Sequence, residues 1–235
     1  MNQIAIPFAG LLLAAGLALG GFFIGNGFYQ SRALERTVEV KGLAEREVPA
    51  DTAIWPIQFT IAGNELEPLL SRLEEQGEQV RAFLTLQGFA DDEISVGAPS
   101  ITDRHAQGYG DPNVRFRYAV SQVITVFTGK VDAVRGAGRE LLELGKAGIV
   151  FSQDNYEYRT QYLFNGLNDI KPAMIEEATR NAREVAEKFA ADSDSRLGKI
   201  RDARQGQFSI SDRDSNNPHV KNVRVVSTLE YYLVD

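Results

Sequence analysis

Cysteine is absent from this sequence, and charge is absent from its beginning. With no cysteine among 235 residues, the chain has no disulfide framework, thiol catalysis or zinc–thiolate site. Lys and Arg number 25 against 32 Asp and Glu, and the net charge of −7 argues against a nucleic-acid partner, which would require clustered basic residues. Residues 1–31 carry no charged side chain. We therefore treat 1–31 and 32–235 as two parts of different character.

The uncharged start of the chain has the length of a membrane anchor. Residues 4–24 contain 21 residues without a charge. A helix of that length, at about 1.5 Å per residue, covers a hydrocarbon core of about 30 Å. The alternative is a cleaved signal peptide, which would have a basic start and a shorter apolar stretch. The length favours a transmembrane helix within 1–31 that contacts the lipid bilayer through residues 4–24.

Glycines in this segment are candidates for helix–helix contact. Gly16 and Gly20 are four residues apart, as are Gly21 and Gly25. Small residues at this spacing allow two helices in a membrane to approach closely. Glycine-rich filler would give the same spacing, so both interpretations stand.

Residues 32–235 change repeatedly between strand and helix periodicity, which is typical of an α+β fold. Antiparallel sheets with two long helices and one shorter helix are expected. No Gly/Ser-rich or Pro-rich linker divides this part, which favours one domain, with two βαββ-like lobes as a variant. The predicted elements are strands 37–48 and 51–62, a helix over 64–88, strands 93–104 and 114–128, a helix over 130–145, a strand-like stretch 149–163, a helix opening at Asp169, and strands 198–210 and 221–234.

Several local signals refine these elements. The short segment 49–51 predicts a tight hairpin between the first two strands. Pro56 cannot donate a hydrogen bond to a ladder, so its strand is expected at an edge or with a bulge. Asn64 followed by Glu67 is a helix-capping pattern. The core-facing stripe predicted for the last helix is Ile175, Ala178, Ala182, Val185, Ala186 and Phe189.

No residue pattern in the sequence identifies a catalytic or metal site. The two histidines, His105 and His219, lie in separate polar loops without the spacing of paired ligands, and exposed loop histidines explain them. We assign no catalytic residue, cofactor or metal ligand. One alternative stays open, namely a ligand- or metal-binding protein or a hydrolase that uses His105 and nearby carboxylates.

Aromatic and arginine side chains alternate in two predicted strand regions. Arg115 and Arg117 lie on the hairpin, and Tyr156 and Tyr158 lie in the strand-like stretch 149–163. Aromatic residues at alternate strand positions usually pack against neighbours. These four residues are our candidates for contacts between subunits.

Residues 37–59 resemble the opening of SIMPL-domain proteins, in which a G-x-A-x-x-x-V-P-x-D-x-A pattern joins the first two strands. The segment RLGKI, residues 196–200, also matches the family pattern, and the resemblance extends over about 36–235. It implies a bacterial envelope protein, often periplasmic, linked in some members to oxidative-stress defence, and it implies self-assembly into large rings. No catalytic residues come with it. The positions that carry the opening pattern are Gly42, Ala44, Val48, Pro49, Asp51 and Ala53.

Location and function follow from combining these signals. Arg32, Arg36 and Lys41 follow the apolar segment, and the positive-inside rule alone would leave the domain in the cytoplasm. The family resemblance favours the periplasm, and we predict an inner-membrane, single-pass protein with a periplasmic domain; a cytoplasmic or a cleaved periplasmic domain is the alternative. The predicted function is non-enzymatic: a homo-oligomer, ring-like or cage-like, with an indirect role in envelope or oxidative-stress defence.

Overall fold

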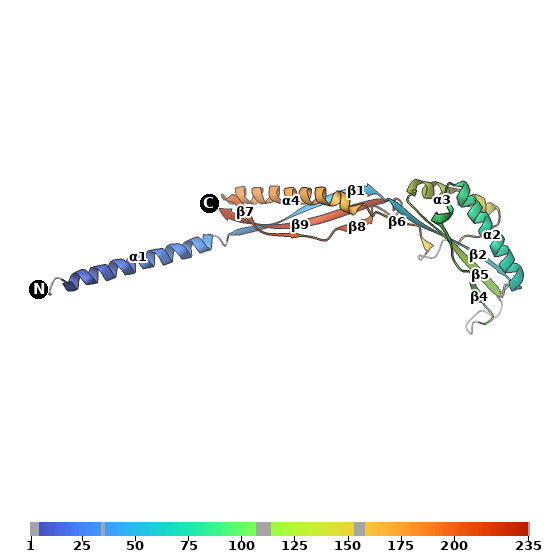
Figure 1. Ribbon diagram of the computed structural model, residues 1–235, viewed down its shortest axis with the longest axis horizontal. Coiled ribbons are helices and arrows are strands. Elements are labelled where there is room, and N and C mark those ends of the chain that lie inside the picture. Colours follow the sequence, from blue (N-terminus) through green and yellow to red (C-terminus); the bar gives the residue numbers. More distant parts are fainter. Residues whose placement is uncertain (1–4, 34–35, 107–113, 153–157, 235) are drawn as a thin grey trace. The chain divides into compact units, whose positions relative to one another are not determined.

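The structure is a computed structural model that describes residues 5–33, 36–106, 114–152 and 158–234. Its strands pair in an antiparallel manner, which confirms the α+β class predicted from the sequence. The elements, labelled in Figure 1, are α1 (Ala5–Ala33), β1 (Thr37–Pro49), β2 (Thr52–Gly63), α2 (Leu66–Leu86), the short 3-10 helix η1 (Asp91–Glu93), β3 (Ile94–Val96), β4 (Ser100–Asp103), β5 (Tyr118–Thr128), α3 (Val131–Lys146), β6 (Gln161–Leu163), α4 (Leu167–Asp192), β7 (Arg196–Gln205), β8 (Ser209–Asp212) and β9 (Val220–Val234).

The chain forms two compact units, each built around its own sheet. The first sheet has the strand order β1-β9-β7, with β8 also paired to β9. The second has the order β3-β5-β2-β6, with β4 also paired to β5. The first unit consists of Met1–Arg46, Ile170–Ser209 and Val223–Asp235, and the second of Glu47–Asp169 and Ile210–Asn222.

The tight hairpin predicted at 49–51 is wrong, because β1 and β2 belong to different sheets. The N–H of Ala50 donates to the carbonyl oxygen of His219 at 2.8 Å, and the N–H of Asp51 donates to that of Leu163 at 2.9 Å. These two groups are therefore used by distant segments instead of closing a turn. β2 pairs instead with β5, over eleven residue pairs.

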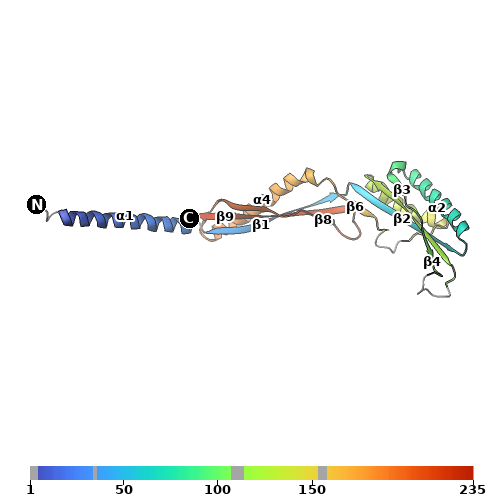
Figure 2. The same ribbon diagram turned by 60° about the horizontal axis from the view of Figure 1, so that its bottom comes forward.

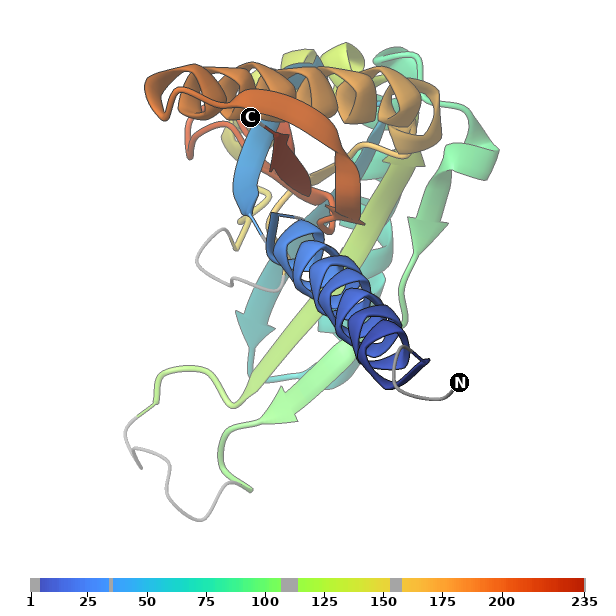
Figure 3. The same cartoon turned by 90° about the vertical axis from the view of Figure 1, so that its left-hand side faces the viewer.

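Helix α4 lies along one face of the first sheet, as the orange helix in Figure 3 shows. Val185 and Phe189, predicted to face the core, are 42% and 55% exposed, so the predicted stripe is wrong at these positions. The helix is instead turned so that small side chains meet the sheet. The residues of α4 that are buried occur at every fourth position: Met174, Ala178, Ala182, Ala186 and Ala190.

Gly42 sets the distance between β1 and α4. A Cβ atom at this position would overlap the carbonyl oxygen of Ala178 and lie 2.8 Å from the Cβ of Ala182. Only glycine fits here without moving the helix. The glycine of the opening pattern thus has a packing role, and the small residues of α4 are its counterpart.

Helices α2 and α3 contact each other and pack on the second sheet. Figure 2 shows α2 alongside β2. The core between them includes Trp55, whose ring meets that of Phe89 edge-on at 6.2 Å between centroids. The predicted strand 93–104 is broken into β3 and β4, because Gly97 and Pro99 interrupt it. The stretch 149–163 contributes only β6 and a single bridge from Phe151 to Phe59 within its described residues.

The capping pattern at Asn64 and Glu67 does not form a cap. Helix α2 begins at Leu66 without a side-chain hydrogen bond from its N-cap residue, Glu65. The side-chain oxygen of Asn64 instead accepts the backbone N–H of Arg117 at 3.0 Å. The side chain that should cap the helix therefore holds the start of β5 against the end of β2.

The N-terminal segment is one helix, α1. Among the described residues, the structure contains no helix that is long and apolar enough to cross a membrane. The predicted transmembrane anchor, with its lipid contact through 4–24 and its inner-membrane location, is therefore unsupported. Glycine at positions 16, 20, 21, 25 and 27 adds no apolar side-chain surface to the described part of this helix.

Asp51 fastens the segment that leads into α4. Its carboxylate accepts the N–H groups of Asn165 at 2.6 Å and Gly166 at 3.0 Å, and the hydroxyl of Thr52 at 2.9 Å. Burial alone would raise the pKa of Asp51, but these hydrogen bonds outweigh it and bring the pKa below the usual 3.8. The aspartate of the opening pattern thus acts as a structural acceptor.

Replacing Gly42 with alanine should strongly destabilise the first unit. The added methyl group meets backbone atoms, which cannot rotate away, so Gly42→Ala should lower the free energy of unfolding by about 3 kcal/mol or more. Denaturant unfolding followed by circular dichroism measures this. The matched control is Gly136→Ala in α3, where nothing lies within 4 Å of the added Cβ. The control should gain about 0.5–1 kcal/mol from helix propensity. Equal stability of G42A and the parent would contradict the packing role.

Replacing Asp51 with asparagine should lower stability at neutral pH by about 1 kcal/mol, because one acceptor oxygen is lost and a donor faces donors. Since the folded-state pKa of Asp51 is lowered, its contribution is full above the unfolded pKa and is lost as the pH falls through the folded pKa. Urea unfolding at several pH values should show the difference between parent and D51N shrinking below about pH 4. The exposed Asp92→Asn variant is the control. A difference that stays constant down to pH 2 would refute this role.

Candidate functional site

Arg115 and Arg117, which we predicted to contact another subunit, both lie just before the first residue of β5. Arg117 donates to both carboxylate oxygens of Asp103, at 2.8 Å from Nη2 and 3.2 Å from Nε, and these hydrogen bonds lower the pKa of Asp103. Its guanidinium carbon lies 4.8 Å from the centre of the Tyr118 ring, and that of Arg115 lies 5.3 Å from the centre of the Phe116 ring. Arg117 thus braces the hairpin internally, and a contact with another subunit stays a prediction for both.

His105 follows the same hairpin strand, with an exposed side chain. Its backbone N–H donates to Asp103 at 3.0 Å, so the neighbouring carboxylate is already held by this group and by Arg117. Among the described residues, no three His, Asp or Glu side chains gather as metal ligands would. The structure therefore gives no observation in favour of a site at His105.

His219 differs from the exposed loop residue that we predicted. It is half-buried, and its ring meets that of Tyr162 edge-on at 6.1 Å between centroids. Burial is the main cause that lowers the pKa of His219, and the nearby Arg135 and Arg213 lower it further.

The remaining predicted contact residues are only partly described. Gly16, Gly20, Gly21 and Gly25 lie on α1, and nothing lies within 4 Å of the Cβ position of any of them. Their role in helix contact stays a prediction. Tyr156 lies outside the described residues. Tyr158 is half-buried and lines a cavity of the second unit.

The edge of β1 opposite β9 is the first candidate site, because no strand among the described residues pairs with it. The carbonyl oxygen of Arg36 accepts the N–H of Leu233 on β9. In an antiparallel strand the N–H and C=O of one residue point to the same side, and the side alternates along the chain. The even-numbered residues of β1 therefore face β9, and odd-numbered residues such as Lys41 direct their backbone groups away from the sheet. This edge is 13 residues long.

One stripe of α4 overhangs that edge. Glu177 pairs with Arg46 of β1 at 3.5 Å, and the side-chain amide of Asn181 donates to the carbonyl oxygen of Leu43 at 2.8 Å. Residues four apart lie above one another on a helix, so Val185 and Phe189 continue this stripe along β1. These are the two large apolar side chains of α4 that are exposed. An open strand edge thus runs beneath an apolar overhang.

The two edge strands of the first sheet differ in charge. The exposed charges of β1 are mainly acidic, namely Glu39, Lys41, Glu45 and Glu47. Those of β7 are mainly basic, namely Arg196, Lys199, Arg201 and Arg204. β7 also shifts register at two points, between Leu197 and Ile200 and between Ile200 and Asp202, which leaves a regular stretch over 202–205.

The edge strands of the second sheet are short by comparison. β3 and β6 have three residues each, and β4 has four. Short edges are one way in which proteins avoid unwanted strand addition. The first sheet is therefore the better candidate for pairing with another strand.

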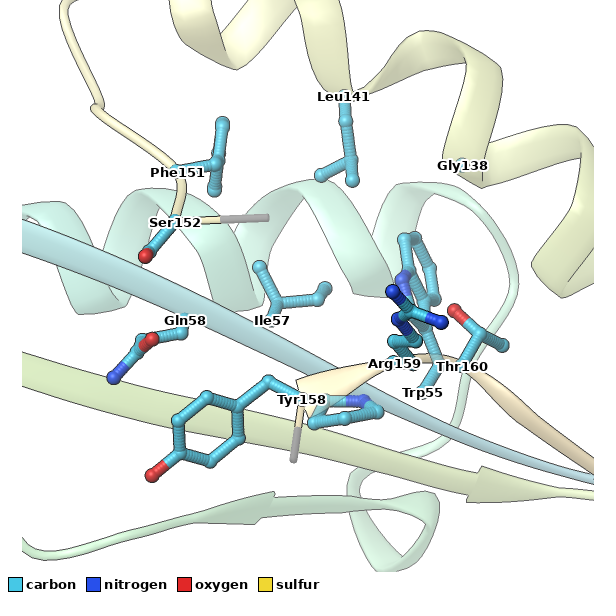
Figure 4. A pocket seen from close by; sticks show the side chains of 11 residues that line it. Trp55, Ile57, Gln58, Gly138, Leu141, Phe151, Ser152, Tyr158, Arg159 and Thr160 are labelled. Carbon is cyan, nitrogen blue, oxygen red and sulfur yellow. The ribbon is translucent and has the colours of Figure 1, made fainter. Parts of the chain in front are cut away.

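A groove in the second unit is the second candidate site. It consists of two cavities, of about 310 Å³ and 440 Å³, that share Trp55, Gly138 and Thr160 in their walls. Figure 4 shows the smaller cavity, with Trp55 and Ile57 from β2 and Leu141 from α3 around it. We missed this groove in the sequence because its walls come from segments more than 100 residues apart. The one available signal was Pro56, which lies in the wall of the smaller cavity.

Comparison with known proteins identifies the family but not an activity. A search of the curated proteins finds no match. The sequence model of the SIMPL family, described as a protein of unknown function (DUF541), matches residues 38–227 and so includes segments of both units. Since this match takes in well over half of the 235 residues, the chain belongs to the SIMPL family.

Proposed function

We propose that this protein is a non-enzymatic scaffold that assembles with copies of itself through the first sheet. In this arrangement the β1 edge of one copy receives the β7 edge of the next. The observation that supports the proposal most is the open edge of β1 beneath the exposed side chains of Val185 and Phe189.

Strand addition would satisfy this surface in two ways. The outward N–H and C=O groups of β1 would gain partners, as in known cases of strand addition to a sheet edge. The apolar overhang would also be covered, and burying the exposed halves of Val185 and Phe189 is worth roughly 1 kcal/mol each. Ile200 on β7, 49% exposed, offers an apolar side chain from the other partner.

Opposite charge favours β7 as the incoming edge. The mainly acidic face of β1 would repel a second β1 edge and attract the mainly basic β7. Because β1 and β7 are different surfaces, the contact is head-to-tail, and such contacts build closed rings when the rotation between copies closes. This supports the ring-like or cage-like assembly that the family resemblance implies.

Any part in oxidative-stress defence would be indirect on this proposal. The chain has no cysteine, so it cannot reduce peroxides through a thiol. An assembled scaffold would act through its shape or through what it holds. A location in the cell envelope remains an expectation from the family resemblance.

A proline in the β1 edge should prevent assembly without unfolding the chain. The N–H of Lys41 points away from β9, so Lys41→Pro removes a donor that the sheet does not use but an added strand would need. We expect a monomer by light scattering on the purified full chain, where the parent forms a homo-oligomer. Lys41→Ser, which loses the same charge but keeps the N–H, should still assemble. A monomeric parent, or equal assembly of both variants, would refute the edge contact.

A charge on the overhang should weaken assembly as well. Phe189→Asp places a carboxylate where the incoming strand would cover an apolar ring, so the concentration at half-assembly should rise at least tenfold. The control is Leu142→Asp in α3, whose side chain is 68% exposed in the second unit. Native mass spectrometry over a range of concentrations measures both variants. If L142D weakens assembly as much as F189D, the contact does not lie at α4.

A further inference from the structure

We propose that the groove of the second unit binds a small amphipathic anion. The ligand class is an aromatic or branched hydrocarbon body that carries one carboxylate-like group. The hydrocarbon part would occupy the cavity at Trp55, Ile57 and Leu141, and the anionic group would lie in the cavity at Arg135 and Arg139.

The groove exists because, among the described residues, a short stretch of β2 has no paired strand on the side where β6 lies. β6 pairs with β2 over Thr52–Ile54, and farther along the carbonyl oxygen of Gln58 accepts the N–H of Ser152 while the N–H of Thr60 donates to Val150. By strand alternation, the backbone groups of Pro56 point to this same side. Proline has no N–H, so no donor is left without a partner where the sheet edge opens. The opening is therefore built into β2 itself.

The size and lining of the groove suit a small molecule. The cavities, of about 310 Å³ and 440 Å³, lie within the usual range for ligand pockets. The smaller cavity combines the apolar side chains of Trp55, Ile57, Leu141 and Phe151 with polar ones such as Gln58 and Arg159. In the larger cavity, Ser215, Asn216 and His219 line the wall together with the arginines of α3. Apolar side chains and arginines thus line the same groove, which points to a ligand that has both an apolar body and an anionic group.

The charge of the lining is opposite to that of the protein. The chain has a net charge of −7, yet the described residues in the walls of the two cavities include three arginines and no Asp or Glu. Arg139 has no ion-pair partner among the described residues. Arg135 pairs with Asp132 at 3.0 Å, but that aspartate is 91% exposed and does not line the groove. Arg135 and Arg139 are four residues apart, so both reach the same side of α3.

Gly138 keeps the shared wall of the two cavities open. It lies between the two arginines in the wall of both cavities, and nothing lies within 4 Å of the position of a Cβ atom there. Glycine costs about 1 kcal/mol relative to alanine inside a helix, and packing does not demand it here. A side chain at this position would extend into the groove. A ligand that needs this space gives the glycine a physical reason.

A fluorescent probe of the same chemistry can test the site in the full chain. Anilinonaphthalene sulfonate has an aromatic body and one negative charge. The protein contains one tryptophan, Trp55, and it lies in the walls of both cavities, so energy transfer from Trp55 reports binding in the groove. We expect saturable transfer in the parent. Unlabelled phenylbutanoate should displace the probe, whereas the uncharged phenylbutanol should not.

Two matched pairs of variants separate the groove from general surface binding. Gly138→Leu fills the shared wall and should raise the probe's dissociation constant at least tenfold, whereas Gly136→Leu, on the same helix outside the groove, should change it less than twofold. Arg139→Gln should weaken the probe three- to tenfold, and Arg72→Gln on α2 should leave it unchanged. Circular dichroism confirms that each variant is folded. Equal binding by G138L and G136L, or by R139Q and R72Q, would overturn the proposal.

Discussion

The close contact of β1 with α4 at Gly42 determines which side chains the first unit exposes. Because a backbone carbonyl of the helix lies where a side chain would begin, the helix meets β1 at this point through the small residues Ala178 and Ala182. This fixes the rotation of α4 about its axis, and the same rotation turns Val185 and Phe189 outward above the strand edge. The apolar overhang is thus a consequence of the packing, and the proposed assembly surface depends on one glycine.

The structure of the second unit depends in a similar way on two single residues and their hydrogen-bonding groups. Pro56 lacks an N–H and opens the edge of β2, while Asp51 accepts the backbone donors of the segment before α4. Both positions lie within the opening segment that resembles the family, and Asp51 belongs to its pattern. The pattern therefore describes how a fold is held together. Its aspartate, Asp51, accepts backbone hydrogen bonds instead of facing either candidate site.

The order of helices and strands could be predicted from the sequence, because periodicity is a local property. Helices α2 and α3 were expected almost to their ends. The edge or bulge predicted from Pro56 is found only as a local gap, because β2 lies between β5 and β6 but β6 pairs with it over Thr52–Ile54. The partners of the strands could not be predicted, since β1 and β2 adjoin in the chain yet pair with β9 and β5. The exposure of Val185 and Phe189 could not be predicted either. Their apolar character suggests burial, and the sequence does not show that α4 packs so closely on β1 that only its small residues face the sheet. The groove required residues from both ends of the second unit.

The two proposed sites require different features of the sequence. Assembly through β1 needs backbone groups and a covering of apolar surface, so it tolerates many side chains as long as the strand before Pro49 stays free of proline. The groove instead depends on particular side chains, two arginines spaced four apart and a glycine between them. The first is a property that a fold can keep while its sequence drifts, and the second is not. The residues that would select the ligand are therefore not the residues that build the sheet edge, so either proposed site can be altered without changing the other.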